Sequence, residues 1–191
     1  MRLEAGVRLR RIFGRGFPDP LGFAKTPSRF SDPRHLPEAE RYGVLYLGDG
    51  AKVCFLEAVL RDRRDGVVGG VEIEERELIA RSIATVTVRA PLALVDLRVD
   101  GAVRMGVPSD VVRGSDQLPA RDWALALHEH PSRPDGIAYP SRLNAQTNVA
   151  VFERAIHKLE VSSVTPLLDD REIADMLDVF EIALVPDGAG A

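Results

Sequence analysis

The sequence predicts a single α+β domain in which helices flank a mixed or largely antiparallel sheet. Its 191 residues match the usual length of one domain. A hydrophobic content of 45% and a charged content of 28% suit a soluble fold that buries one core. Apolar stretches of strand length outnumber helical ones, roughly seven to three, without the regular alternation of β-α-β units. We expect the domain to span residues 1–187 and residues 188–191 to form a disordered tail.

The first third of the chain is expected to hold two strands, a long loop and a helix. Residues 7–13 alternate apolar and basic side chains and suit a first strand. Glycine and proline interrupt residues 21–41, and a long ordered loop of this kind often carries function. Residues 42–48 suit a short apolar strand, and residues 51–63 suit a helix that buries Val53, Leu56 and Leu60 on one face.

The remaining chain is expected to add further strands and two helices. No clear pattern covers the whole of residues 71–89, although β-branched residues favour a strand near its end. A helix from Pro119 to Glu129 is expected to bury Trp123, Ala126 and Leu127. A second helix, capped by Asp169 or Asp170, has an apolar face at helical spacing, made of Ile173, Met176, Leu177 and Phe180. Further strands are expected at residues 79–88, 92–97, 136–139, 148–153, 159–164 and 182–185.

Composition also limits the function classes. The formal net charge is −4, from 25 basic and 29 acidic residues, which argues against direct nucleic-acid binding but not against a local arginine pocket for a small anion. Cys54 is the single cysteine, so an intrachain disulfide and a thiolate zinc cluster are excluded. No apolar run has the length of a signal peptide or a membrane span, and we expect a cytoplasmic protein without a membrane partner.

Three charged residues near the first strand and helix are candidates for a binding site, and each also has an ordinary structural interpretation. Glu57 lies between the core and solvent faces of its helix. It either pairs with Arg61 one turn later or forms a carboxylate at the mouth of a pocket. Arg29 lies in a polar loop and Arg11 at the end of the first strand. Each either braces a turn or binds phosphate through its planar guanidinium.

Three further polar features complete the set of candidates. Tyr46 is either a core tyrosine or a ring that stacks on a heteroaromatic ligand. Ser141 follows a proline, as turn residues do, and no Gly-x-Ser-x-Gly pattern marks it as a nucleophile. His128 and His130 point in different directions on a helix, so we expect helix-end charges and no metal site.

The order of these motifs resembles the RES-domain family. That family is named for an arginine, a glutamate and a serine, which match Arg29, Glu57 and Ser141 here. The resemblance runs from about residue 11 to residue 152, and residues 34–41 look like an enlarged loop. The matching segments are residues 11–13, 28–33, 43–47, 55–60 and 136–142.

The resemblance implies a fold similar to ADP-ribosyltransferases and an activity on NAD. Characterised members are toxins of type II toxin–antitoxin systems. Some split NAD with inorganic phosphate, and at least one ADP-ribosylates a metabolic enzyme. The usual partner is an antitoxin with a helix-turn-helix DNA-binding region, whose C-terminal part blocks the pocket of the toxin. We therefore expect a hetero-oligomeric complex with such an antitoxin.

The residues are compatible with phosphorolysis of NAD to nicotinamide and ADP-ribose 1″-phosphate. Nicotinamide leaves as a neutral molecule, so one carboxylate suffices, and we assign Glu57 to stabilise the ribosyl cation. Arg29 and Arg11 would bind phosphate, Tyr46 would pack on the nicotinamide or its ribose, and Ser141 would position the substrate. The alternatives are ADP-ribosyl transfer to a host protein and a catalytically silent ligand-binding or interaction domain.

Overall fold

The computed structural model describes residues 1–186, so the tail expected at 188–191 lies outside the described residues. Ten strands and six α-helices form an α+β fold in this part of the chain, which confirms the predicted class. The strands are β1 (Arg2–Leu3), β2 (Arg8–Gly14), β3 (Val44–Gly48), β4 (Val71–Glu74), β5 (Arg81–Val88), β6 (Leu92–Asp96), β7 (Gly136–Pro140), β8 (Thr147–Phe152), β9 (Leu159–Pro166) and β10 (Ile182–Val185). The helices are α1 (Ala51–Phe55), α2 (Glu75–Ile79), α3 (Gly101–Arg104), α4 (Ser109–Arg113), α5 (Leu118–Glu129) and α6 (Arg171–Val179).

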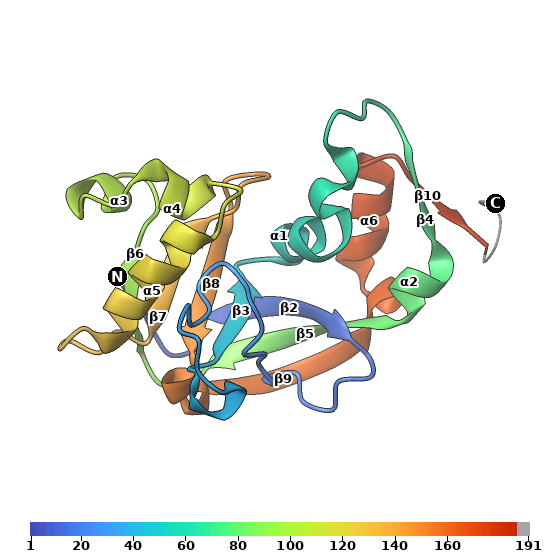
Figure 1. Cartoon of the computed structure of the whole chain (residues 1–191). Helices are drawn as coiled ribbons and strands as arrows, with labels where there is room; N and C mark the ends of the chain where they lie inside the picture. The colour runs from blue at the N-terminus through green and yellow to red at the C-terminus, as the bar shows by residue number, and fades with distance from the viewer. Residues whose placement is uncertain (187–191) are drawn as a thin grey trace.

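Eight of the strands form one curled sheet, in the order β1-β6-β7-β8-β3-β2-β5-β9, and β4 pairs with β10 beside it. The sheet is mixed, as expected, because β6 and β7 run parallel while the other neighbours are antiparallel. The β2–β3 junction consists of a single residue pair, Arg10 with Gly48. We call this junction the seam. It divides the sheet into one half of five strands and another of three (Figure 1).

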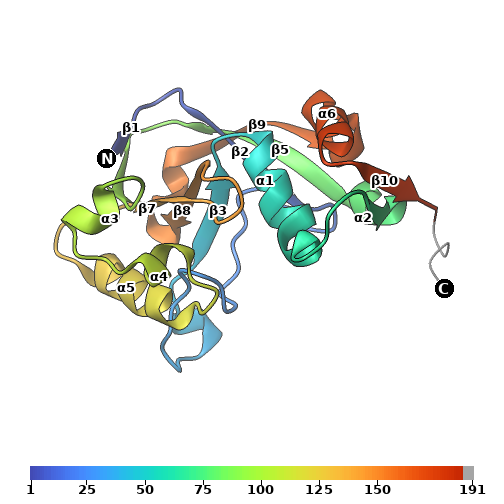
Figure 2. The ribbon, with the colours of Figure 1, turned by 90° about the horizontal axis from the view of Figure 1, so that it is seen from above.

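Each half carries its own group of helices on one face of the sheet. Helices α3, α4 and α5 lie over the half that contains β7 and β8, whereas α1 and α6 lie over the half that contains β2 and β5 (Figure 2). One apolar cluster, including Val111, Ala124 and Phe152, fills the space under α4 and α5. Another, including Phe55 and Ile173, fills the space under α1 and α6. A third cluster lies on the opposite, inner face of the curled sheet and joins the two halves.

The helix that follows β3 changes type along its length. α1 continues as a π-helical turn, Leu56–Leu60, and then as a 3-10 turn, Arg61–Arg64, so the expected helix at 51–63 is present but irregular. Gly48 permits the start of α1 to approach the strand closely. A Cβ at this glycine would lie 2.5 Å from Cγ1 of Val53 and 2.7 Å from Sγ of Cys54. The close approach brings the π-helical turn to the seam, and widened turns of this kind are frequent at functional sites.

Several short elements were not expected from the sequence. These are β1, α3 and α4, together with β4 and α2 within the unclear region. The buried face of α5 also differs from the prediction, because Ala126 is exposed and the buried residues are Ala120, Ala124 and Leu127. α6 matches its prediction, with Ile173 and Met176 buried and its first turn capped by the Asp170 side chain. No helix within residues 1–186 is long and apolar enough to cross a membrane.

Candidate active site

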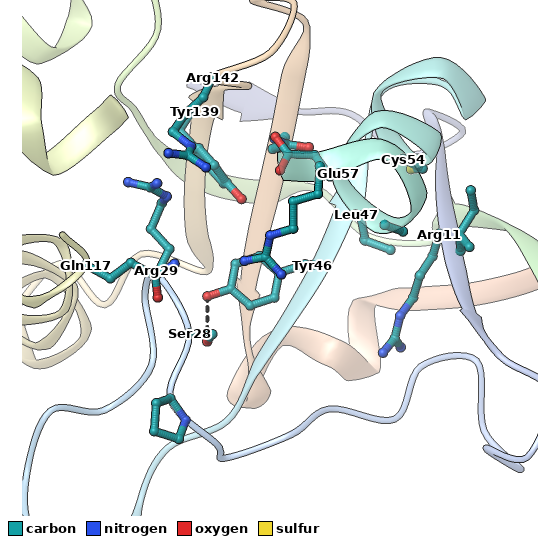
Figure 3. A pocket seen from close by; sticks show the side chains of 15 residues that line it. Arg11, Ser28, Arg29, Tyr46, Leu47, Cys54, Glu57, Gln117, Tyr139 and Arg142 are labelled. Atoms are coloured by element: carbon teal, nitrogen blue, oxygen red, sulfur yellow. Dashed lines mark hydrogen bonds between the residues drawn. The ribbon is translucent and has the colours of Figure 1, made fainter. Parts of the chain in front are cut away.

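A pocket of about 340 Å³ opens at the seam, on the face of the sheet that carries the helices. This volume lies within the range of about 300–1,000 Å³ that is usual for small-molecule sites. β2 and β3 supply one wall each, the π-helical turn lies above them, and the loop before β3 closes the far side (Figure 3). The lining residues are Arg11, Ile12, Pro27, Ser28, Arg29, Tyr46, Leu47, Cys54, Glu57, Ala58, Arg61, Gln117, Tyr139, Arg142 and Asn148.

Glu57 lies in the first turn of the π-helix and faces this pocket. Its Oε1 atom accepts a hydrogen bond of 2.7 Å from Oγ of Ser141 and one of 3.0 Å from Nδ2 of Asn148. The nearest acidic partner of Arg61 is Asp62, at 3.8 Å. Of the two interpretations of Glu57, the structure therefore shows the carboxylate in a pocket and not the ion pair along the helix.

Arg29 lines the same pocket from the loop that precedes β3. Its Nη2 atom donates to the carbonyl oxygen of Gly114 at 2.9 Å, and Nη1 lies 3.5 Å from the carbonyl oxygens of Val111 and Val112. These carbonyls end α4, where the helix dipole favours a cation. Burial lowers the pKa of the guanidinium, and the positive charge of Arg142 acts in the same direction. Arg29 remains a cation and faces the carboxylate of Glu57 across the pocket.

Tyr46 has the satisfied hydroxyl of a core tyrosine and also lines the pocket. Its ring lines the pocket, while its hydroxyl accepts a hydrogen bond from the backbone N–H of Phe30 and shares one with Oγ of Ser28, each 2.9 Å long. Ser28 and Phe30 flank Arg29 in the sequence, so the tyrosine hydroxyl holds the arginine loop against β3 (Figure 3).

Ser141 is 1% exposed and lies behind Glu57, outside the lining of the pocket. Its Oγ accepts from the backbone N–H of Leu143 at 3.1 Å and donates to Glu57. The serine therefore contacts the glutamate directly and would reach a ligand only through it.

Arg11 is placed apart from the other candidates. Its Nη1 atom donates to the carbonyl oxygens of Pro20 and Gly22, both at 2.6 Å, and Figure 3 shows the side chain pointing away from Arg29 and Arg142. Burial lowers the pKa of this guanidinium. Arg11 contributes to the β2 wall and braces the loop at 15–22, and the structure does not bring it beside Arg29.

Comparison with known proteins identifies the family. The model of the RES domain matches residues 8–172, which is most of the chain. The chain belongs to the RES-domain family. A relative described as "Probable toxin y4kH", from Sinorhizobium fredii (strain NBRC 101917 / NGR234), is 44% identical over 127 residues, covering 66% of this chain and all of the relative. These findings confirm the resemblance that the motifs indicated.

The fold of this RES domain is also found in a solved structure. A chain in the crystal structure of the M. tuberculosis MbcT–MbcA toxin–antitoxin complex superposes with a TM-score of 0.66 at 17% identity. The alignment covers 94% of this chain and 91% of that chain. At this identity the likeness concerns the fold, and it supports a single α+β domain with a mixed, curled sheet.

Several lining residues of the RES domain were missed by the sequence analysis. Tyr139 and Arg142 lie within the matched segment 136–142, and their side chains reach the pocket beside Arg29 (Figure 3). Burial raises the pKa of Tyr139 well above its ordinary value, so the hydroxyl stays protonated. Asn148 had a signal in the sequence, because its amide directly precedes the apolar run of β8, and the structure buries it. The pocket is lined by four arginines and one glutamate although the whole chain carries a net charge of −4.

Two other residues of the RES domain, Cys54 and His128, are uncharged at neutral pH. Burial raises the pKa of Cys54 to about 12, and its thiol donates to the carbonyl oxygen of Arg10, so it is not a thiolate nucleophile. His128 stacks on Tyr42 at 4.2 Å, and burial together with Arg154 lowers its pKa to about 4. The expected helix-end charge at His128 is therefore wrong, because this histidine is neutral at pH 7.

Within residues 1–186, no group of three or more His, Cys, Asp or Glu is placed to hold a metal ion.

Proposed function

We propose that this RES domain degrades NAD by phosphorolysis and acts as the toxin of a type II toxin–antitoxin pair. The observation that carries the proposal is the single carboxylate of Glu57, held by two hydrogen-bond donors in a pocket otherwise rich in arginine. A pocket with this charge pattern suits a ligand that combines phosphates with a cationic centre. NAD has both, in its pyrophosphate and in its nicotinamide ring, whose positive charge passes to the ribose as the bond between them breaks.

The reaction needs few groups from the protein. The bond between C1 of the ribose and the nicotinamide nitrogen breaks, both electrons stay with the nitrogen, and nicotinamide departs as a neutral molecule. An oxygen of inorganic phosphate then forms the new bond to the same carbon, which gives ADP-ribose 1″-phosphate. Glu57 stabilises the positive charge that develops on the ribose, an effect commonly worth about 3–4 kcal/mol.

The other lining residues bind and orient the two substrates. Arg29 and Arg142 face the carboxylate from the opposite wall and hold the pyrophosphate or the attacking phosphate (Figure 3). Arg11 adds positive charge to the β2 wall while its own hydrogen bonds fix the neighbouring loop. The ring of Tyr46 packs on the nicotinamide or its ribose, and Ser141 acts through Glu57.

The comparisons support a toxin role and an antitoxin partner. One relative is described as a probable toxin, and the solved structure with the same fold is part of a toxin–antitoxin complex. We propose that the partner of this chain is an antitoxin with a helix-turn-helix region, which forms a hetero-oligomer with it. Expressing the chain alone and with the product of a neighbouring gene, and recording host growth, tests this part of the proposal.

The chemistry is tested by weighing the products of purified protein incubated with NAD, with and without phosphate. We expect nicotinamide and ADP-ribose 1″-phosphate, formed only when phosphate is present, and formation of both about 10²–10³-fold slower with Glu57→Gln. Plain ADP-ribose formed at a rate independent of phosphate would replace phosphorolysis by hydrolysis. Label from NAD on a macromolecule would indicate ADP-ribosyl transfer instead. Unchanged NAD in every arm would mean a catalytically silent domain.

A further inference from the structure

Asn148 is buried at the seam and contacts Glu57 from β8. It is not one of the three residues for which the family is named. The residue is 6% exposed and lies on β8, between Gly48 of β3 and Tyr139 of β7 in the sheet register. Its amide nitrogen is 3.0 Å from Oε1 of Glu57, the same oxygen that Ser141 contacts at 2.7 Å. Two side chains, on the strand β8 and on the loop that precedes it, therefore converge on one oxygen of the carboxylate.

Both of these contacts present a hydrogen-bond donor to Oε1 of Glu57. An amide NH₂ group donates hydrogen bonds and cannot accept one. The hydroxyl of Ser141 already accepts from the N–H of Leu143, so its own proton is directed to Glu57. Oε1 therefore accepts from both side chains at once, which fixes the orientation of the carboxyl group.

The same geometry fixes which oxygen can act on a ligand. Oε1 is occupied by the two donors, so the second oxygen, Oε2, is the one left to act on a ligand in the pocket. We propose that Asn148 is a positioning residue that, together with Ser141, holds the carboxyl group of Glu57 in one orientation, with Oε1 anchored and Oε2 presented to the substrate. The catalytic consequence rests on the proposed function, but the anchoring of the carboxylate does not.

Other charged or titratable side chains also face Glu57, and the titration experiment has to account for them. Arg29 faces it from the loop before β3 and Tyr139 from β7, with Arg142 directly after that strand. Cys54 lies one turn earlier on α1 and stays protonated. Arg61 lines the pocket from the end of the π-helical turn. These side chains are the same in the wild type and in every variant of Asn148, so a shift in the titration of Glu57 is assigned to the change at residue 148.

The direct experiment is a pH titration of the Glu57 carboxyl carbon by ¹³C NMR, with the resonance assigned by its loss in Glu57→Gln. Asn148→Asp is nearly isosteric and places a second carboxyl where the donor was. We expect the titration midpoint of Glu57 to move to higher pH, by about one unit or more, because two facing carboxyls share a proton. Asn148→Ala removes the donor without adding charge, and we expect a smaller move in the same direction. Asn144→Ala, an asparagine of the same β7–β8 loop whose hydrogen bonds go to Gln146, is the matched control and should titrate as the wild type does.

Kinetics provide the second readout. A hydrogen bond to a charged group corresponds to a rate effect of about 10–100-fold, so Asn148→Ala should lower kcat by that factor while KM for NAD stays within about twofold. An unchanged Glu57 titration in Asn148→Asp overturns the proposal, as does a rise in KM at constant kcat in Asn148→Ala, which would make Asn148 a substrate contact. A wild type that leaves NAD intact would reject the proposed function, while the NMR titration would still decide the anchoring.

Discussion

Arg61 offers a test in which stability and ligand binding change in opposite directions. It follows the π-helical turn with φ of 34° and ψ of −115°, a conformation that suits glycine and strains any residue with a Cβ. Strain of this kind costs about 1–3 kcal/mol. The side chain is 60% exposed, and its contact with Asp62 is long at 3.8 Å, so losing that pair costs little.

Arg61→Gly should therefore stabilise the fold. Relief of about 1–3 kcal/mol is reduced by the extra freedom of glycine in the unfolded chain, about 0.5–1 kcal/mol, which leaves a gain of about 1 kcal/mol. For a chain of this length that gain raises Tm by about 2–4 °C. Urea and thermal unfolding measure it, with Arg61→Ala as the control that removes the same side chain but keeps the Cβ.

Both variants also remove a guanidinium from the pocket, so both should raise KM for an anionic substrate to a similar extent. A strained residue retained at a pocket exchanges stability for binding. Equal unfolding free energies for the glycine and alanine variants, or a glycine variant less stable than the wild type, would refute the reasoning.

Three further changes have defined outcomes. Glu57→Gln keeps an oxygen that can accept from Ser141 and Asn148, so kcat for NAD cleavage should fall about 10²–10³-fold while the urea midpoint stays near that of the wild type. Gly48→Ala should lower the free energy of unfolding by about 1–3 kcal/mol, because its Cβ would overlap α1. Gly16→Ala, which meets nothing within 4 Å, should change that free energy by less than about 0.5 kcal/mol, and equal values for the two would contradict the packing argument. His128 takes up a proton near pH 6.5 when unfolded but only near pH 4 when folded, so stability should fall as the pH drops between these values. His128→Phe keeps the stack on Tyr42, and urea unfolding at pH 7 and pH 5 should show a smaller loss than in the wild type.

Most strands and the two longest helices, α5 and α6, were predicted closely from the sequence. β2, β3, β8 and α6 were expected within one or two residues of their observed bounds, because strand alternation and helical spacing are local properties. β1, with two residues, and α3, with four, are too short to leave such a pattern. Their stability comes from tertiary packing, which no window of sequence contains.

The candidate site was also predicted only in part, because local patterns identify segments of the chain but not the long-range contacts between them. Arg29 and Glu57 belong to segments with recognisable order, and the structure places them on facing walls of one pocket. Ser141 is in contact with Glu57, but its burial behind the carboxylate depends on the turn to Leu143. Arg11 lies apart because the carbonyls of the 15–22 loop occupy its guanidinium. Neutral His128 was mistaken for a charge because its ring partner, Tyr42, is 86 residues earlier in the chain.

The seam gives the molecule an intrinsic line of weakness at the place where a ligand would sit. A single residue pair joins β2 to β3, and the walls of the pocket belong to halves that carry separate helical layers. A molecule that contacts both Arg29 and Glu57 acts as a clamp across this line. We therefore expect an occupied pocket to restrain any opening of the two halves, and the amide protons that border the junction to exchange with solvent more slowly in the filled protein than in the empty one.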